Sequence, residues 1–276
     1  MDSSFLSILS FAMSKNYLSF LQQTAPTQDK NIHFYFYYQE KVWLKKATKS
    51  RPTWFFLPLK GIAQIFGLHL LVPVANVGGT KAIQCEIHRI QALAQVGVRV
   101  PEILAYTDDT LLLKDAANNE IEIDQLEAIL NNTSDFQRRF TLYQKAVMEI
   151  ARIHEKKSYL SEAFARNILV DSQHNFTFID FETDPRSYFT LTECFARDWL
   201  CFMFSTARFF DENELSEVAI FLANQLKASP EILQLICQVG QRIQWLLSLK
   251  IEKLGNDGRR LKKSLLLIKE LSEFSI

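Results

Sequence analysis

Residues 154–182 read HEKKSYLSEAFARNILVDSQHNFTFIDFE. Two apolar runs flank the polar stretch DSQHN, a pattern that predicts a short β-hairpin. Asn167 stands just before the first run and Asp180 follows the second. An amide oxygen and a carboxylate that converge from a loop and a strand end are ligand types that Mg²⁺ accepts. The alternative is that Asn167 is a turn residue and Asp180 merely ends a strand.

The chain before this hairpin contains most of the predicted β structure. Aromatic and β-branched residues at 33–47 predict a hairpin that turns at Gln39-Glu40, and shorter strands are expected at 102–107 and 110–114. The pair Gly78-Gly79 leads to Thr80, a suitable N-cap for a helix over residues 80–96. We therefore expect residues 1–114 to form a β-rich unit with one main helix.

From residue 115 onward the periodicity is helical. Residues 140–154 place apolar side chains at helical spacing, and the chain from Thr190 to its end also predicts helices. Residues 115–276 should therefore form a mostly helical unit that contains the hairpin. The overall expectation is an α+β fold in two parts.

The hairpin and its flanks resemble the protein kinase-like superfamily. In that family a helix ends in a leucine-histidine step, followed by a loop H-x-D-x-x-x-x-N and a metal-binding Asp-Phe-Gly aspartate. Ile153-His154 matches the helix end, Asn167 the loop asparagine, and Asp180-Phe181 the aspartate. The resemblance implies a bilobal fold with ATP and Mg²⁺ between the lobes, and Asn167 and Asp180 as metal ligands. It assigns His154 a structural hydrogen-bonding role at the helix end.

The same resemblance points to two residues in the first unit. The strand VWLK is similar to the family's V-A-I-K, so Lys45 is expected to grip the α and β phosphates, with Lys46 as a competitor. Glu86 falls within the apolar stripe of the 80–96 helix, where a carboxylate needs a cationic partner. The family pairs this glutamate with the strand lysine. The alternative is a helix-edge glutamate paired with Arg89 or Lys81.

Downstream, the hydrophobic segment ARDWLCFMF contains Asp198. A lone carboxylate in such a helix requires hydrogen-bond donors. In kinase-like folds an aspartate of this helix accepts backbone N–H groups of the catalytic loop and holds its shape. We expect the same role for Asp198.

The chain departs from the family at three places. Glu162 stands where the family has its catalytic aspartate, and Leu160 replaces the histidine two residues earlier. Glutamate can accept a proton, but its extra methylene shifts the carboxylate, so Glu162 is a candidate for orienting an acceptor hydroxyl. No glycine precedes Gly61, so residues 23–31 would have to cover the phosphates without a glycine-rich loop.

The short spacing from Asp180 to Asp198 points to compact bacterial kinases. The motif DFE in place of DFG, the WLKKA strand, the apolar insertion after it and the GVRVPEILAY segment look similar to the bacterial lipopolysaccharide core kinase group. Members of that group phosphorylate Kdo or heptose on lipid A precursors at the inner face of the cytoplasmic membrane. The resemblance implies an ATP- and Mg²⁺-dependent kinase acting on a sugar or lipopolysaccharide-type glycan. A pseudokinase-like nucleotide-binding or regulatory module and an atypical protein kinase are the alternatives.

Composition and charge restrict the partners. Lysine plus arginine and aspartate plus glutamate both total 31, so no global field favours nucleic acid. Four cysteines without a CxxC pair predict a cytoplasmic chain with reduced thiols. The apolar segment 54–74 contains Lys60, His69, two prolines and two glycines, which argues against a membrane span. We expect either an interfacial helix, which would contact the inner face of the cytoplasmic membrane peripherally, or a helix that packs on a lobe of the protein.

Overall fold

The computed structural model describes residues 15–48, 68–72, 74, 78–117 and 122–274. The fold is α+β, with a four-stranded antiparallel sheet in the order β1-β2-β4-β3 and a three-stranded antiparallel sheet in the order β5-β6-β7. The strands are β1 (Ile32–Tyr37), β2 (Glu40–Lys46), β3 (Ile103–Tyr106), β4 (Thr110–Lys114), β5 (Ile123–Gln125), β6 (Ile168–Asp171) and β7 (Phe176–Phe178). The strands predicted from residues 102–114 and the hairpin between Asn167 and Asp180 are thus confirmed.

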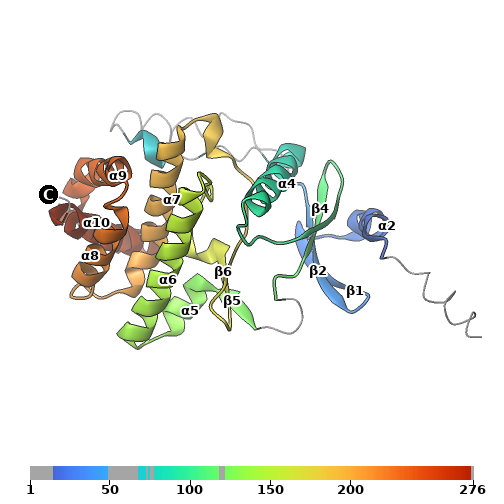
Figure 1. Cartoon of the computed structure of the whole chain (residues 1–276), viewed down its shortest axis with the longest axis horizontal. Helices are drawn as coiled ribbons and strands as arrows, with labels where there is room; N and C mark the ends of the chain where they lie inside the picture. Colours follow the sequence, from blue (N-terminus) through green and yellow to red (C-terminus); the bar gives the residue numbers. More distant parts are fainter. Residues whose placement is uncertain (1–14, 49–67, 73, 75–77, 118–121, 275–276) are drawn as a thin grey trace, which may run out of the picture.

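Helices form most of the rest of the described chain. Figure 1 shows the four-stranded sheet with α2 and α4 on one side of the molecule and helices α5 to α10 on the other. The helices are α2 (Tyr17–Thr24), α4 (Gly79–Gln95), α5 (Leu126–Asn132), α6 (Phe136–Glu155), α7 (Leu191–Thr206), α8 (Leu215–Leu226), α9 (Pro230–Ile243) and α10 (Asn256–Glu273). The helices predicted over residues 80–96 and 140–154 correspond to α4 and α6.

Strand β2 separates its side chains onto two faces. Val42 and Leu44 are fully buried against Leu21 of α2, and the neighbouring Lys46 Nζ donates to the carbonyl of Gln28 at 2.8 Å. Lys45 points the other way, toward α4, because successive side chains of a strand alternate. Figure 1 shows α2 and α4 on opposite sides of this sheet. The strand period therefore decides between Lys45 and Lys46.

The hairpin between β1 and β2 turns one residue earlier than the sequence predicted. Tyr37 pairs with Glu40, so the two turn residues are Tyr38 and Gln39, with φ of 46° and 62°. Two-residue turns with positive φ at both positions match the right-handed twist of the flanking strands. The prediction of a Gln39-Glu40 turn was wrong because that twist outweighs the cost of positive φ at two non-glycine residues.

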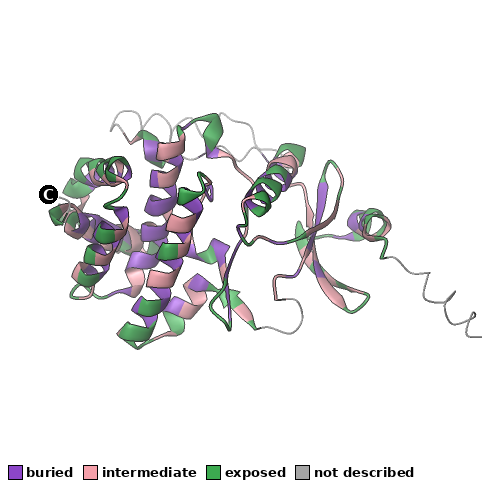
Figure 2. Cartoon of the chain, viewed as in Figure 1, coloured by how far each residue is buried: buried purple, intermediate pink, exposed green. Residues whose placement is uncertain are grey.

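Helix α7 forms the centre of the helical part. It begins with a capping box, in which the Thr190 side chain accepts from the backbone of Glu193 and Glu193 accepts from the backbone of Thr190. Most of its residues are buried, including Trp199 and Phe202. Figure 2 shows the burial along this helix, between α6 and the C-terminal helices. A helix that is apolar nearly all round belongs inside a core.

Part of the apolar segment after β2 packs on α7. Residues 54–67 and 73 lie outside the described residues, so the predicted membrane contact concerns a segment of which only 68–72 and 74 are described. Arg197 of α7 donates to the carbonyls of Leu70 and Val72, and Leu70 is buried. No helix in the described part of the chain has the length and apolar character needed to cross a membrane.

Asp171 closes the β6–β7 turn. Its carboxylate accepts from the backbone N–H groups of Gln173 and Asn175, both at 2.9 Å, and from the Arg99 guanidinium at 3.0 Å. Burial by itself would raise the pKa of Asp171, but these hydrogen bonds and those from the Asn175 side chain outweigh it and hold the pKa below its usual range. The ionised carboxylate therefore stabilises the hairpin that carries Asn167 and Asp180.

We predict that Asp171→Asn lowers the free energy of unfolding by about 1–3 kcal/mol near neutral pH, because donors at a buried turn lose a charged acceptor. A pKa lowered in the folded state gives stability that is present above the unfolded pKa of about 4 and is lost as pH falls through the folded pKa. The difference between wild type and variant, measured by urea unfolding, should shrink below about pH 4. Asp108→Asn, at an exposed aspartate, is the control, and an equal effect of both variants would contradict the assignment.

Candidate functional site

The candidate site lies where β2, α4 and the segment after β7 meet. The ammonium of Lys45 lies 2.7 Å from Glu86 Oε2, 2.8 Å from Glu182 Oε1 and 3.5 Å from Asp180 Oδ1. Three of the residues singled out in the sequence, Lys45, Glu86 and Asp180, are therefore brought together. The expected ion pair between the strand lysine and the helix glutamate is present.

The burial of Glu86 explains why it needs Lys45. Glu86 is 2% exposed and lies on the same face of α4 as Ile83, Ile87 and Ile90. An unpaired carboxylate in such a place is costly, so a cation must reach it. The two alternative partners of Glu86 are engaged elsewhere or exposed. Arg89 donates to the Tyr159 carbonyl and stacks on the Tyr159 ring, and Lys81 is exposed.

The ammonium of Lys45 and the carboxylates around it shift one another's pKa values. Burial by itself would lower the pKa of Lys45, but Glu86, Glu182 and Asp180 together raise it above its usual range. Burial raises the pKa of Glu86, although Lys45 opposes that shift. Lys45 is thus the ammonium that Glu86, Asp180 and Glu182 share.

Glu182 is the member of this cluster that the sequence reading missed as a site residue. It stands two positions after Asp180, in the motif DFE, and its side chain is 21% exposed. The signal was present, because the family resemblance expects a glycine there and this chain has a carboxylate. That Glu182 pairs with Lys45 depends on where the tertiary structure places β2.

Asn167 and Asp180 lie at the same edge of the β6–β7 hairpin. The backbone N–H of Ile179 donates to the carbonyl of Asn167 at 3.0 Å, and Asp180 follows directly. Asp180 has a φ of 72° and a side chain that is 47% exposed. A left-handed conformation is strained for a residue other than glycine, and such strain concentrates at functional sites.

The loop between α6 and β6 is held by Asp198. Its Oδ2 accepts from the backbone N–H of Leu160 at 2.7 Å and from His154 Nε2 at 3.1 Å, and Asp198 is fully buried. The His154 ring stacks on Phe195 with centroids 4.3 Å apart. Helix α7 thus positions the loop through one carboxylate, in the arrangement expected for Asp198 and His154.

Glu162 lies in the middle of this loop. Its backbone carbonyl accepts from Asn167 Nδ2 at 3.3 Å, which joins it to the Asn167 end of the hairpin. Burial raises the pKa of Glu162; Arg197 and Arg166 oppose the shift, whereas Asp180 adds to it. Arg166 itself is exposed and stacks over the Phe164 ring at 4.5 Å.

The segment expected to cover the phosphates lies elsewhere. Ala25 packs with Val42 and Leu44, and the Gln28 side chain donates to the carbonyl of Leu44. Both residues lie on the α2 face of the sheet, opposite the face that carries Lys45. The prediction that residues 23–31 cover the site was wrong, because the apolar face of α2 finds its core against the outer side of the sheet.

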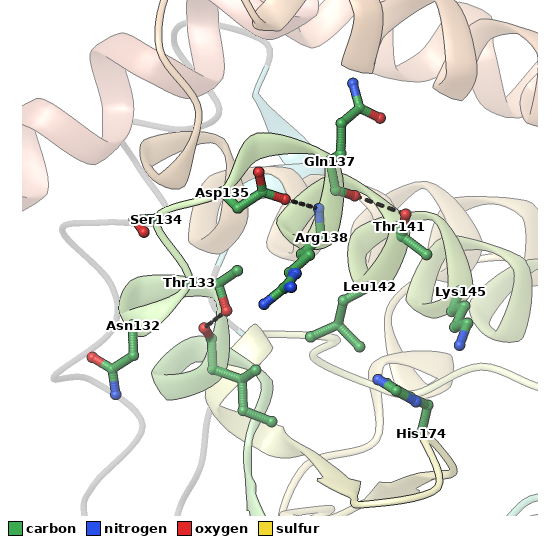
Figure 3. A pocket seen from close by; sticks show the side chains of 11 residues that line it. Asn132, Thr133, Ser134, Asp135, Gln137, Arg138, Thr141, Leu142, Lys145 and His174 are labelled. Atoms are coloured by element: carbon green, nitrogen blue, oxygen red, sulfur yellow. Dashed lines mark hydrogen bonds between the residues drawn. The ribbon is translucent and has the colours of Figure 1, made fainter.

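A cavity elsewhere in the described structure does not coincide with this cluster. It measures about 690 Å³ and lies between α5, α6 and the β6–β7 turn, where Arg138, Lys145 and His174 line it (Figure 3). Two of its polar groups serve local structure: Asp135 caps α6 by accepting from the backbone of Arg138, and the Thr133 hydroxyl donates to the Ile129 carbonyl. None of the candidate residues lies in it.

Comparisons with known proteins add no assignment. No family model matches the chain, and a search of the curated proteins found no match. Within the described residues no group of three or more histidine, cysteine, aspartate or glutamate side chains is arranged to hold a metal ion. Asn167 and Asp180 are an amide and a carboxylate, so any metal they hold must complete its shell with ligand or water oxygens.

We predict that Lys45→Met lowers the free energy of unfolding by about 3 kcal/mol, because Glu86 is left buried without a partner. Lys46→Met, one residue away on the other face of β2, should cost less than about 1.5 kcal/mol. The double variant Lys45→Met/Glu86→Leu should recover part of the loss, since both charges are then gone. Chemical denaturation measures all three, and equal losses for the two lysine variants would contradict the assignment.

Proposed function

We propose that this chain is an ATP- and Mg²⁺-dependent phosphotransferase with a bilobal, protein kinase-like arrangement. In this proposal residues 1–114 form the β-rich lobe and residues 115–276 the helical lobe. The observation that carries it is the ion pair between Lys45 and Glu86 with Asp180 at the same ammonium. A strand lysine held by a helix glutamate beside a metal-binding aspartate is the arrangement that protein kinases use to hold ATP phosphates.

The donor set fits magnesium and a triphosphate. Lys45 would contact the α and β phosphates, and Asn167 and Asp180 would supply oxygen ligands to Mg²⁺. The metal would neutralise negative charge on the phosphates. The carboxylate of Asp180 is 47% exposed and lies 3.5 Å from the Lys45 ammonium, so it can offer oxygen ligands to a divalent cation beside the phosphates.

The acceptor is proposed to be a hydroxyl of a sugar or lipopolysaccharide-type glycan, on the basis of the resemblance to the lipopolysaccharide core kinases. Glu162 would orient that hydroxyl and accept its proton. The support is its place in a loop anchored by Asp198 and joined through Asn167 to the hairpin edge next to Asp180.

A second candidate function is a nucleotide-binding or regulatory module without catalysis. Two observations favour it: Leu160 and Glu162 replace the histidine and aspartate of the catalytic loop, and the segment before β1 lies on the outer face of the sheet. Nucleotide binding is common to both candidates, so binding and turnover must be measured separately.

We predict that the wild type binds ATP with an affinity that rises when Mg²⁺ is added, and that Asp180→Asn weakens the Mg²⁺-dependent binding by at least about tenfold, or about 1.4 kcal/mol. The variant keeps the size of the side chain and removes its charge. Isothermal calorimetry with and without Mg²⁺ measures this, with Asp108→Asn as the control. Equal affinities for wild type and Asp180→Asn would refute the nucleotide site.

We further predict that Glu162→Gln slows phosphoryl transfer to a lipopolysaccharide precursor by about 10²–10⁴-fold while leaving the affinity for Mg-ATP unchanged, because an amide cannot accept the hydroxyl proton. Labelled ATP and product separation measure the transfer. Binding of Mg-ATP by the wild type without transfer to any acceptor would favour the regulatory module instead.

A further inference from the structure

A second cavity adjoins the loop that carries Glu162. It has a volume of about 310 Å³ and is bounded by α7, α9, α10 and the 3₁₀ turn His69–Leu71. Its walls are largely apolar, with Leu200, Phe204, Val239 and Leu265 among the lining residues. Small-molecule sites begin at about this size and have mostly apolar walls with a few placed polar groups.

Two opposite charges line this cavity. The carboxylate of Glu162 makes no hydrogen bond or close ion pair among the described residues, and it feels the charges of Arg197 and Arg166. Arg197 is 6% exposed. Its Nη1 donates to the carbonyls of Leu70 and Val72, while its Nε has no acceptor among the described residues. The hydroxyl of Ser264 donates to backbone carbonyls of its own helix. A carboxylate and a buried guanidinium nitrogen, both without a hydrogen bond among the described residues, thus adjoin an apolar wall.

These two charges select the head group of a ligand. An ammonium would be attracted by Glu162 but repelled by Arg197, and a carboxylate the reverse, so a full charge gains little here to offset the cost of leaving water. A hydroxyl can donate to the carboxylate and accept from the guanidinium at once. A bare sugar would place many hydroxyls against apolar walls that cannot hydrogen-bond them, which is costly.

The cavity is connected to the proposed site of phosphoryl transfer. The carbonyl of Glu162 accepts from the Asn167 side chain, and the Asn167 carbonyl accepts from the residue before Asp180. The same loop residue therefore lines the apolar cavity and adjoins the hairpin edge with the proposed metal ligands. A hydroxyl held at Glu162 would lie at the boundary between the two.

We infer that this cavity binds the apolar body of an aliphatic or prenyl-type alcohol, with its hydroxyl on Glu162. The inference rests on the proposed phosphotransferase and replaces its glycan acceptor with this alcohol, because the apolar walls cannot hydrogen-bond a sugar. In the transfer, the hydroxyl oxygen bonds to the γ-phosphorus of ATP, the bond to the bridging oxygen breaks, ADP leaves, and the proton passes to Glu162.

The binding test uses 1-decanol as the probe, without ATP or Mg²⁺. Isothermal calorimetry on the full chain should show saturable binding of 1-decanol, binding of decyl methyl ether weaker by at least about tenfold because the donor is lost, and none for glucose. Stronger binding of decylamine than of 1-decanol would overturn the neutral head group. Binding of glucose without 1-decanol would overturn the apolar cavity.

Two cavity-filling variants and one matched control locate the binding. Leu261 lines the cavity and is partly exposed, so Leu261→Trp should fill it and weaken 1-decanol binding at least tenfold. Leu71→Trp, at a lining residue that is 40% exposed, should act in the same way if the first variant does not fold. Leu249→Trp, 48% exposed and outside the cavity, should bind as the wild type does. Equal affinity in the wild type and a folded filled variant would overturn the inference.

The acceptor role is tested separately with γ-labelled ATP and Mg²⁺. Label in decyl phosphate, lost in Leu261→Trp but kept in Leu249→Trp, supports it. A chain that binds both Mg-ATP and 1-decanol but transfers no label would overturn the acceptor role. If Mg-ATP does not bind at all, the proposed function fails, whereas the calorimetry with 1-decanol still decides whether the cavity takes an alcohol.

Discussion

The ion pair between Lys45 and Glu86 is the interaction on which the candidate site depends. It ties a central strand of the sheet to the buried face of α4, and the same ammonium reaches Asp180 and Glu182 beyond β7. Each partner needs the other, because a buried carboxylate without a cation and a buried ammonium without an anion are both costly. Three distant segments of the chain are therefore held at one point.

Helix α7 anchors neighbouring segments of the chain through two buried charged side chains. Its Asp198 fixes the backbone of the loop at Leu160 and the ring of His154, so a buried carboxylate again sets the position of a polar segment. Its Arg197 fixes the chain at Leu70 and Val72, which follows the sheet strand β2 in sequence. One apolar helix thus anchors both the loop with Glu162 and a segment from the first half of the chain.

These two anchors give the site an asymmetric environment. On one side lie Lys45, whose ammonium suits phosphates, and Asp180, whose carboxylate oxygens suit a metal ion. On the other side Glu162 adjoins apolar walls, which suit the body of an acceptor. The proposed phosphotransferase would need both kinds of surface, since a charged nucleotide and an acceptor would have to meet while water is kept away from the reacting groups.

The sequence by itself determined the local elements and the residue types of the site. Alternating and helical patterns of apolar residues predicted β3, β4, α4, α6 and the β6–β7 hairpin. The position of Glu86 within an apolar stripe predicted that its buried carboxylate needs a cation. Only the tertiary structure decided that Lys45 is the lysine that pairs with Glu86 and that Glu182 joins this cluster. It also decided that α2 packs on the outer face of the sheet and that Glu162 borders a cavity. Periodic patterns report which face of one element is buried, whereas the partner of that face comes from distant parts of the chain through packing.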